Sequence, residues 1–153
     1  GFGFDVHKLV EGRDLWMGGI KLDHQLGLLG HSDADVLLHA ICDALLGAAN
    51  MRDIGYHFPD TSADMKDIDS KILLKKTIEL IATKGYRVGN IDCTICAERP
   101  KMKPHIPEMK ECIASIMDTD TDNISIKATT TEKLGFTGRE EGISAYATVL
   151  IYK

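Results

Sequence analysis

Hydrophobic and polar residues alternate over several short stretches of the chain, as they do in half-buried β-strands. Five stretches predict strands: Phe2 to His7, Leu15 to Leu22, Tyr86 to Glu98, Ile124 to Thr130 and Ile143 to Tyr152. Gly12 and the Gly18-Gly19 pair indicate turns or bulges near the first two of these strands. We therefore expect a hairpin at the N-terminus.

Three other stretches repeat apolar residues at helical spacing. The first follows Ser32-x-x-Asp35, which resembles a variant capping box. Its apolar stripe consists of Leu37, Ile41, Ala44, Leu45 and Ala48. The second helix is predicted from about Ser70 to Lys84, with Gly85 as its C-terminal stop, and the third begins near Pro104.

The polar segment from Met51 to Asp69 has no sustained period, which is typical of a mobile loop. No repeat or linker divides the 153 residues, and a single domain commonly has about 100–150 residues. We expect residues 1–153 to form one domain. The predicted fold class is α+β, a two-layer sandwich of a mixed β-sheet packed against about three helices.

Composition and charge narrow the classes of function. Hydrophobic residues make up 44% of the chain and charged residues 27%, which is ordinary for a globular protein. The net charge of −5 gives no basic surface for a phosphate backbone, so we expect no nucleic-acid partner. No apolar run approaches the roughly 20 residues that span a bilayer, so we expect no membrane partner. The expected compartment is a bacterial cytoplasm, with the plastid stroma of a processed protein left open.

The four cysteines are Cys42, Cys93, Cys96 and Cys112. Cys93 and Cys96 have the CxxC spacing of many zinc sites. They lie in a predicted strand, however, where residues three apart point to opposite faces, and the chain has no second CxxC. We therefore interpret the thiols as small core residues.

A metal site is indicated by Asp5, His7 and His39. Asp5 and His7 lie two apart in a predicted strand, so their side chains leave the same face, and His39 lies on the first predicted helix. Two imidazoles and one carboxylate leave a coordination position open, as in catalytic zinc sites. We predict a zinc ion on these three residues. The alternative that spacing alone leaves open is a histidine that only satisfies a hydrogen bond.

Asp35, His39 and Asp43 form an i, i+4, i+8 row on the same helix. A solvated helix face would usually include lysine and glutamate, yet no Lys, Arg or Glu lies between Ser32 and Met51. We therefore expect this face to line a cavity.

Two further segments have chemistry suited to phosphate. Residues Ala128 to Lys133 combine three threonines with Glu132 at the end of a predicted strand, where hydroxyls and backbone amides can donate to phosphate oxygens. Glu132 suits Mg²⁺, which takes few carboxylates and completes its shell with water and phosphate. His31-Ser32 precedes a helix, whose free amides favour an anion. The alternatives are a threonine-rich strand that ends in a turn and a simple N-cap.

Five separated segments together resemble one family. They are Gly3 to His7, His31 to Val36 with His39-Ala40, Asp53 to Gly55, Phe58 to Thr61 and Ala128 to Gly138. Their order and spacing, over nearly the whole chain, are similar to those of the 2-C-methyl-D-erythritol 2,4-cyclodiphosphate synthases of the non-mevalonate isoprenoid pathway. The resemblance implies a homotrimer whose active sites lie between adjacent subunits, which the sequence pattern itself does not indicate.

The resemblance also implies roles for individual residues. It implies zinc on Asp5, His7 and His39, and Mg²⁺ or Mn²⁺ on Glu132 together with the substrate diphosphate. The implied catalytic residues, which stabilise the transition state, are His31 and Thr130. The implied substrate-binding residues are Asp5, His7, His31, Ser32, Asp53, Ile54, Gly55, Phe58, Pro59, Asp60, Thr61, Ser62, Ala97, Pro100, Lys101, Met102, Lys103, Thr129, Thr130, Thr131, Glu132, Phe136 and Arg139.

Within this set, Asp53 and Gly55 correspond to the ribose-binding positions of the family. Residues 97–103 correspond to a cytosine pocket across the subunit interface, and residues 58–62 to a flexible loop over the methylerythritol portion. Phe136 and Arg139 correspond to positions near a central channel that holds an anion in some members. Here Glu140 follows Arg139, and an added carboxylate would disfavour such an anion.

The implied reaction is the cyclisation of 4-diphosphocytidyl-2-C-methyl-D-erythritol 2-phosphate, a small cytidine diphosphate substrate. Its 2-phosphate attacks the β-phosphorus, CMP leaves, and 2-C-methyl-D-erythritol 2,4-cyclodiphosphate is formed. The chain has no nucleophile elbow or paired Cys-His motif, which agrees with a nucleophile that belongs to the substrate. Two alternatives stay open: a zinc-dependent phosphohydrolase, and a non-catalytic trimer that binds nucleotides or isoprenoid diphosphates.

Overall fold

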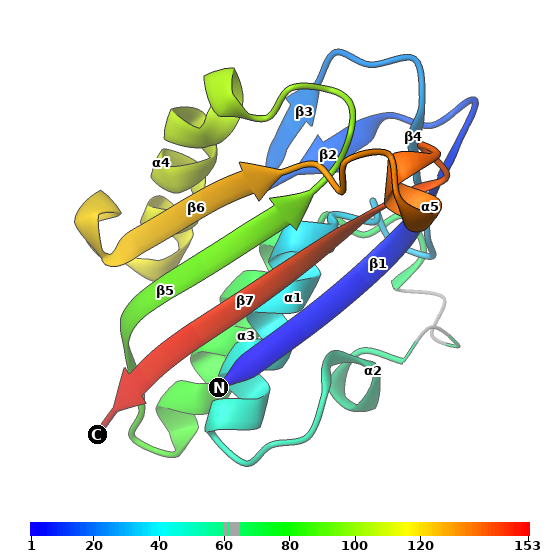
Figure 1. The fold of residues 1–153 in the computed structure, drawn as a ribbon. Helices are drawn as coiled ribbons and strands as arrows, with labels where there is room; N and C mark the ends of the chain where they lie inside the picture. Colours follow the sequence, from blue (N-terminus) through cyan, green and yellow to red (C-terminus); the bar gives the residue numbers. More distant parts are fainter. Residues whose placement is uncertain (60, 62–64) are drawn as a thin grey trace.

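The computed structural model describes residues 1–59, 61 and 65–153, and its centre is a five-stranded sheet (Figure 1). The strands, in their order across the sheet, are β4 (Gly27–Leu29), β1 (Phe2–Val10), β7 (Gly142–Tyr152), β5 (Arg87–Cys96) and β6 (Ile124–Thr129). β5 and β6 are parallel, and all other neighbours are antiparallel. The predicted mixed sheet is confirmed.

A separate hairpin is formed by β2 (Leu15–Met17) and β3 (Ile20–Leu22). The segment predicted as a strand from Leu15 to Leu22 is two strands, because Gly18 and Gly19, where the sequence indicated a turn or bulge, reverse the chain with positive φ angles of 61° and 82°. The expected N-terminal hairpin therefore lies within this segment, and β1 pairs instead with β4 and β7. Only three residues long, β4 offers too little alternation for detection from the sequence.

The three predicted helices are present as α1 (Val36–Ala48), α3 (Ser70–Thr83) and α4 (Ile106–Met117). Two one-turn helices, α2 (Ile54–His57) and α5 (Gly135–Gly138), and two 3-10 turns, η2 (Lys103–His105) and η3 (Thr121–Asn123), were not predicted. α2 lies inside the segment expected to be a loop. A helix of four residues gives no sustained hydrophobic period, which explains why the pattern missed it.

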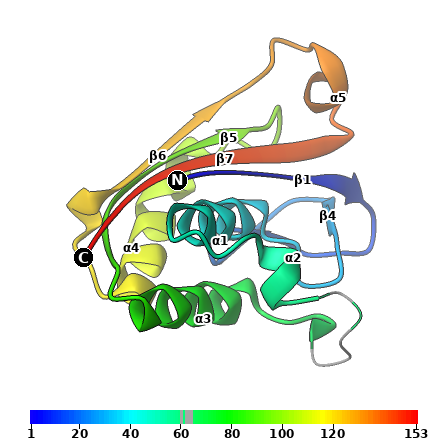
Figure 2. The ribbon, with the colours of Figure 1, turned by 90° about the horizontal axis from the view of Figure 1, so that it is seen from below.

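Figure 2 shows the long helices α1, α3 and α4 on one side of the sheet. α1 packs against β1 and β7, and α3 packs against the other side of α1. α1 is therefore enclosed between the sheet and α3, and 9 of its 13 residues are buried. The predicted packing of helices on a sheet is confirmed. At α1 the helices form two layers, because α3 covers the side of α1 that faces away from the sheet.

The start of α1 differs from the predicted capping box. Its N-cap is Asp35, whose Oδ1 accepts hydrogen bonds from the amides of Leu38 and Gly18, while its Oδ2 accepts one from Gly19. Ser32 accepts from the amide of Ala34, two residues on, and lies outside the helix. The predicted start is thus wrong by three residues, because both Ser and Asp suit an N-cap and the sequence does not rank them.

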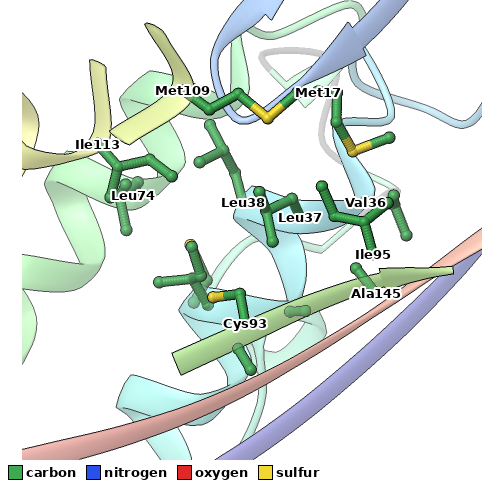
Figure 3. Close-up of a cluster of buried hydrophobic side chains, with 14 of the residues drawn as sticks. Met17, Val36, Leu37, Leu38, Leu74, Cys93, Ile95, Met109, Ile113 and Ala145 are labelled. Atoms are coloured by element: carbon green, nitrogen blue, oxygen red, sulfur yellow. The ribbon is translucent and has the colours of Figure 1, made fainter. Parts of the chain in front are cut away.

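The core lies between the sheet and the helices (Figure 3). Fully buried side chains from α1, α3, β5 and α4 meet there, namely Leu37, Leu38, Leu74, Ile95, Met109 and Ile113. Cys42 and Cys93 belong to the same core, and burial raises the pKa of each thiol to about 12. All four cysteines are free thiols, which agrees with their interpretation as packing residues. Within the described ranges, no helix has the length and apolarity needed to cross a membrane.

Candidate metal centre

The alternation of β1 brings Asp5 and His7 to the face of the sheet that α1 covers. Phe4 and Val6, the intervening residues, are exposed on the opposite face. His39 projects from α1 toward the two inward side chains. His7 Nε2 lies 2.9 Å from Asp5 Oδ2, His39 Nδ1 lies 3.1 Å from the same oxygen, and the two ring nitrogens are 3.2 Å apart. The predicted convergence of these three residues is confirmed.

The cluster fits a divalent metal ion, since each residue offers one ligand atom and these atoms all lie within 4.8 Å of one another. The far nitrogen of His7, Nδ1, lies 2.8 Å from the carbonyl oxygen of Leu29. A carbonyl only accepts, so Nδ1 carries a proton. Nε2 is the nitrogen that faces the cluster, where it can donate a proton to Asp5 or, without that proton, bind a metal ion. His39 is anchored through its own far nitrogen, Nε2, 2.9 Å from the hydroxyl of Ser70.

Electrostatics favour a cation at the same point. Burial alone would raise the pKa of Asp5, but hydrogen bonds with His39 and His7 outweigh it and hold that pKa at about 2. Burial alone would lower the pKa of His7, but its hydrogen bond with Asp5 outweighs burial and raises that pKa above the usual value. Asp5 is therefore ionised at neutral pH and attracts positive charge, whether a proton on His7 or a metal ion.

A cavity of about 290 Å³ opens beside the cluster. The predicted site residues that line it are Asp5, His7, His31, Ser32, His39, Ile54, Gly55 and Phe58. Of the polar row on α1, His39 and Asp43 face this cavity, as expected. Asp35 does not, because it is fully buried and holds the start of α1 to the β2–β3 turn.

Asp43 is a candidate site residue that the family motifs did not include. Its Oδ1 accepts a 2.7 Å hydrogen bond from the amide of Ile54, which ties α1 to the first turn of α2. Asp53 caps α2 by accepting from the amide of Tyr56. These two carboxylates set the position of the α2 wall of the cavity. The sequence signal that pointed to Asp43 was its place in the i, i+4, i+8 row, on a helix without Lys, Arg or Glu.

The threonine segment lies elsewhere, in the turn after β6. The amides of Thr131 and Lys133 both donate to Oε1 of Glu98, at 3.2 and 3.1 Å. The amide of Glu132 donates to the hydroxyl of Thr130 at 3.3 Å. Each of these three amides therefore has an acceptor within the chain, and the expectation that they bind phosphate stays a prediction. The hydroxyl of Thr130 in turn donates to Oε1 of Glu132 at 3.3 Å, and the side chain of Glu132 is exposed.

Other predicted residues do not reach the first cavity. Pro100 and Lys101 line a separate hollow with Glu98 and Lys133, and Phe136 lines a third together with His7. Ala97 and Met102 are buried, whereas Pro59, Thr61, Lys103 and Thr129 are exposed. Within the described part of the chain, no residue of 97–103 or 129–139 lines the first cavity. Asp60 and Ser62 lie outside the described residues.

Arg139 has a partner that the sequence did not indicate. Its Nε and one terminal nitrogen lie 3.0 and 3.2 Å from the two carboxylate oxygens of Glu141, a bidentate pair. Glu140, which we expected to disfavour an anion, lies instead 3.7 Å from Arg99. The carboxylate that competes with an anion for Arg139 is therefore that of Glu141.

The fold and the cluster define a class: an α+β protein with an open two-histidine, one-carboxylate site for a divalent metal. The chain belongs to the YgbB family, whose model matches residues 1–152. A 2-C-methyl-D-erythritol 2,4-cyclodiphosphate synthase of Bacteroides thetaiotaomicron is 80% identical to it, over 100% of this chain and 96% of the relative. A synthase of the same name from Porphyromonas gingivalis is 65% identical, over 99% of this chain and 93% of the relative.

The similarity extends to solved structures. A 2C-methyl-D-erythritol-2,4-cyclodiphosphate synthase in its CDP-bound form superimposes with a TM-score of 0.91 at 32% identity and covers 99% of both chains. The IspF protein of Plasmodium falciparum, in a CDP complex, gives a TM-score of 0.86 at 34% identity, over 99% of this chain and 93% of that one. The family expected from the sequence motifs is confirmed.

Proposed function

We propose that this protein converts 4-diphosphocytidyl-2-C-methyl-D-erythritol 2-phosphate to 2-C-methyl-D-erythritol 2,4-cyclodiphosphate with release of CMP. The observation that carries the proposal is the Asp5, His7 and His39 cluster beside a cavity, in a chain 80% identical to a synthase of that name. The proposed compartment is a bacterial cytoplasm, supported by the bacterial origin of the relatives.

We propose zinc as the ion held by Asp5, His7 and His39, because two imidazoles and a carboxylate suit it and leave a position for a ligand. Glu132, exposed at the end of β6, is proposed to hold Mg²⁺ or Mn²⁺ with the substrate diphosphate. When bound, these ions neutralise phosphate charge and polarise the phosphorus under attack.

The protein's own groups have to hold two anionic phosphates close together. Ser32 accepts a hydrogen bond from Ala34, so its hydroxyl proton is free to donate to a phosphate oxygen in the cavity. His31 lines the same cavity, and Thr130 is proposed to donate from the neighbouring half of the site. Holding the 2-phosphate near the β-phosphorus can contribute roughly 7–11 kcal/mol, as in well-oriented intramolecular reactions. No protein nucleophile is needed.

The cytidine part of the substrate is proposed to contact two separate groups of residues. Ile54, Gly55 and Asp53 would hold the ribose, and residues 97–103 the cytosine. Phe58 to Ser62 would cover the methylerythritol portion. In one chain residues 97–103 lie outside the first cavity, so the proposed nucleotide site needs a second subunit to bring them to it. This supports the proposal of a homotrimer with interfacial sites.

The outer face of the sheet is suited to such an assembly. Large apolar side chains are exposed there on β1 and β7, namely Phe2, Phe4, Val6, Tyr146, Leu150 and Tyr152. Burial of these side chains against other subunits would remove apolar surface from water. A central anion site at Phe136 and Arg139 stays a prediction, and the Arg139–Glu141 pair opposes it.

The reaction products test the function. Incubation of the purified protein with substrate, zinc and Mg²⁺ should give CMP and a cyclic diphosphate, which phosphorus NMR distinguishes from a linear phosphate. CMP with a linear phosphate would instead favour the phosphohydrolase. No turnover, with nucleotide still bound, would favour the binding trimer. His39→Ala should abolish turnover, and full activity of this variant would refute the metal mechanism.

A further inference from the structure

Ser70, the first residue of α3, joins the metal cluster to a partly buried hydrogen-bond network. Its hydroxyl lies 2.9 Å from Nε2 of His39, the ring nitrogen that faces away from Asp5 and His7. Ser70 has no exposed surface. The contact therefore links a candidate metal ligand on α1 to the N-terminus of α3, a segment far along the chain.

The direction of this hydrogen bond follows from the next residue in the network. The hydroxyl of Ser70 donates to Oδ1 of Asp33 at 2.5 Å, and the amide of Ser70 donates to Oδ2 at 3.0 Å. An ionised carboxylate only accepts, so the single hydroxyl proton of Ser70 is committed to Asp33. Ser70 can then only accept from His39, so Nε2 of that ring carries a proton and Nδ1 is the nitrogen available to a metal ion.

Ser32 is also close to this nitrogen but does not decide the position of the proton. Its hydroxyl lies 3.2 Å from His39 Nε2 and accepts from the amide of Ala34. A hydroxyl has two acceptor sites and one free proton, so Ser32 can either accept from the ring or donate to it. Ser70 is restricted to accepting by its bond to Asp33.

We propose that Ser70 and Asp33 form a relay that fixes the proton of His39 on Nε2 and so presents Nδ1 as a metal ligand. Both are positioning residues, because neither faces the cation directly. The proposal deepens the proposed function, on whose metal centre it rests. His7 achieves the same end through the carbonyl of Leu29. The relay differs in using side chains, which substitution can remove.

A carboxylate is required at residue 33 because both of its oxygens accept. Oδ1 also receives the amide of Asp35 at 3.1 Å. An asparagine would offer one accepting oxygen and place its NH₂ group against a donor. If the NH₂ faced Ser70, the serine hydroxyl would be released to donate to His39 and would favour the wrong tautomer.

Zinc binding tests the relay without recourse to turnover. Wild type, Ser70→Ala and Asp33→Asn are compared by competition with a chromophoric zinc chelator. We expect the two variants to bind zinc about 10- to 100-fold more weakly, the usual effect of removing a partner of a metal-bound histidine. The control is Asp69→Ala, which removes the N-cap of α3 and its bond to the amide of Lys71. It should leave zinc affinity unchanged while lowering thermal stability.

Nitrogen-15 NMR of the zinc-loaded protein supplies a second readout. The Nε2 proton of His39 should give a slowly exchanging signal in wild type and in Asp69→Ala, and a rapidly exchanging one in Ser70→Ala. Equal zinc affinity of Ser70→Ala and wild type would overturn the relay, as would an equal loss in Asp69→Ala. If the wild type cyclises the substrate but Ser70→Ala binds zinc as tightly as the wild type, only the relay is refuted. If the wild type binds zinc through the relay but forms no cyclic product, only the proposed synthase function is refuted.

Discussion

At the scale of single residues, the molecule relies on carboxylates that accept more than one backbone hydrogen bond. Asp35 is fully buried and accepts from the amides of Gly18, Gly19 and Leu38. Burial raises the pKa of Asp35, and the amides of Gly19 and Leu38 oppose that rise. This one side chain fixes where α1 begins and hence, one turn later, where His39 lies.

We expect Asp35→Asn to destabilise the protein by about 1–3 kcal/mol. Both carboxylate oxygens of Asp35 accept hydrogen bonds, whereas the side chain of asparagine has only one accepting oxygen. At least one buried backbone N–H would then lack an acceptor, which costs about 1–3 kcal/mol of stability. Denaturant unfolding of the metal-free protein measures the change. The matched control is Asp120→Asn, since Asp120 is exposed and asparagine caps a helical turn as well as aspartate does. Equal stabilities of the two variants would contradict this account of Asp35.

Glu98 supports the threonine turn in a similar way. One oxygen, Oε1, accepts from both Thr131 and Lys133. We expect Glu98→Ala to lower kcat/KM by about 10- to 100-fold, because loss of both bonds would displace Thr130 and Glu132 from the positions in which we propose that they meet the substrate. Glu98→Gln keeps an accepting oxygen and should retain most of the activity. If Glu98→Gln lost as much activity as Glu98→Ala, the charge of Glu98 would matter, and not the hydrogen bonds that it accepts from the turn.

At the scale of elements, the metal centre depends on how closely β1 approaches α1. A Cβ on Gly3 would overlap with the carbonyl oxygen of Ala40, the residue after His39. Only glycine allows this approach, and Asp5 follows two residues later on the same face. The close packing of strand on helix therefore sets the distance between the ligands from β1 and the ligand from α1.

Gly3→Ala should separate β1 from α1, lower stability by about 1–3 kcal/mol as overpacked cores do, and weaken zinc binding. Gly47→Ala is the control on α1, because no atom beyond the neighbouring residues and the helix's own backbone lies within 4 Å of the added Cβ, and the φ angle is ordinary. It should stabilise the helix by about 0.5–1 kcal/mol and leave zinc binding unchanged. Thermal unfolding and chelator competition measure both effects. Unchanged zinc affinity in Gly3→Ala would show that the approach does not set the site.

The same elements show what the sequence could predict. Alternation along β1 was sufficient to place Asp5 and His7 on one face, because the period of a strand is independent of its partners. The bonds of Asp35 to Gly18 and Gly19, and those of Ser70 to His39 and Asp33, were not predictable, since these partners lie more than a dozen residues away and meet only in the folded chain. The short β4 and α2 were missed because three or four residues contain no period.

At the scale of the whole molecule, the groups suited to one reaction lie in two places. The metal cluster lines the first cavity, whereas Thr130, Glu132 and residues 97–103 lie at the ends of β5 and β6 outside it. The apolar outer face of the sheet offers a surface on which further subunits can pack. A complete site would then combine the first cavity of one chain with the second group of its neighbour.

Subunit mixing tests this arrangement directly. His39→Ala and Glu132→Ala damage different halves of the proposed site, so each variant alone should be inactive. If every site joins one half from each of two neighbours, random exchange between the two variants restores both halves at about one quarter of the interfaces. Activity should therefore appear on mixing and rise with the fraction of mixed trimers seen by native mass spectrometry. Mixed trimers without activity would place both halves in one chain, and a monomeric mass would remove the interface altogether.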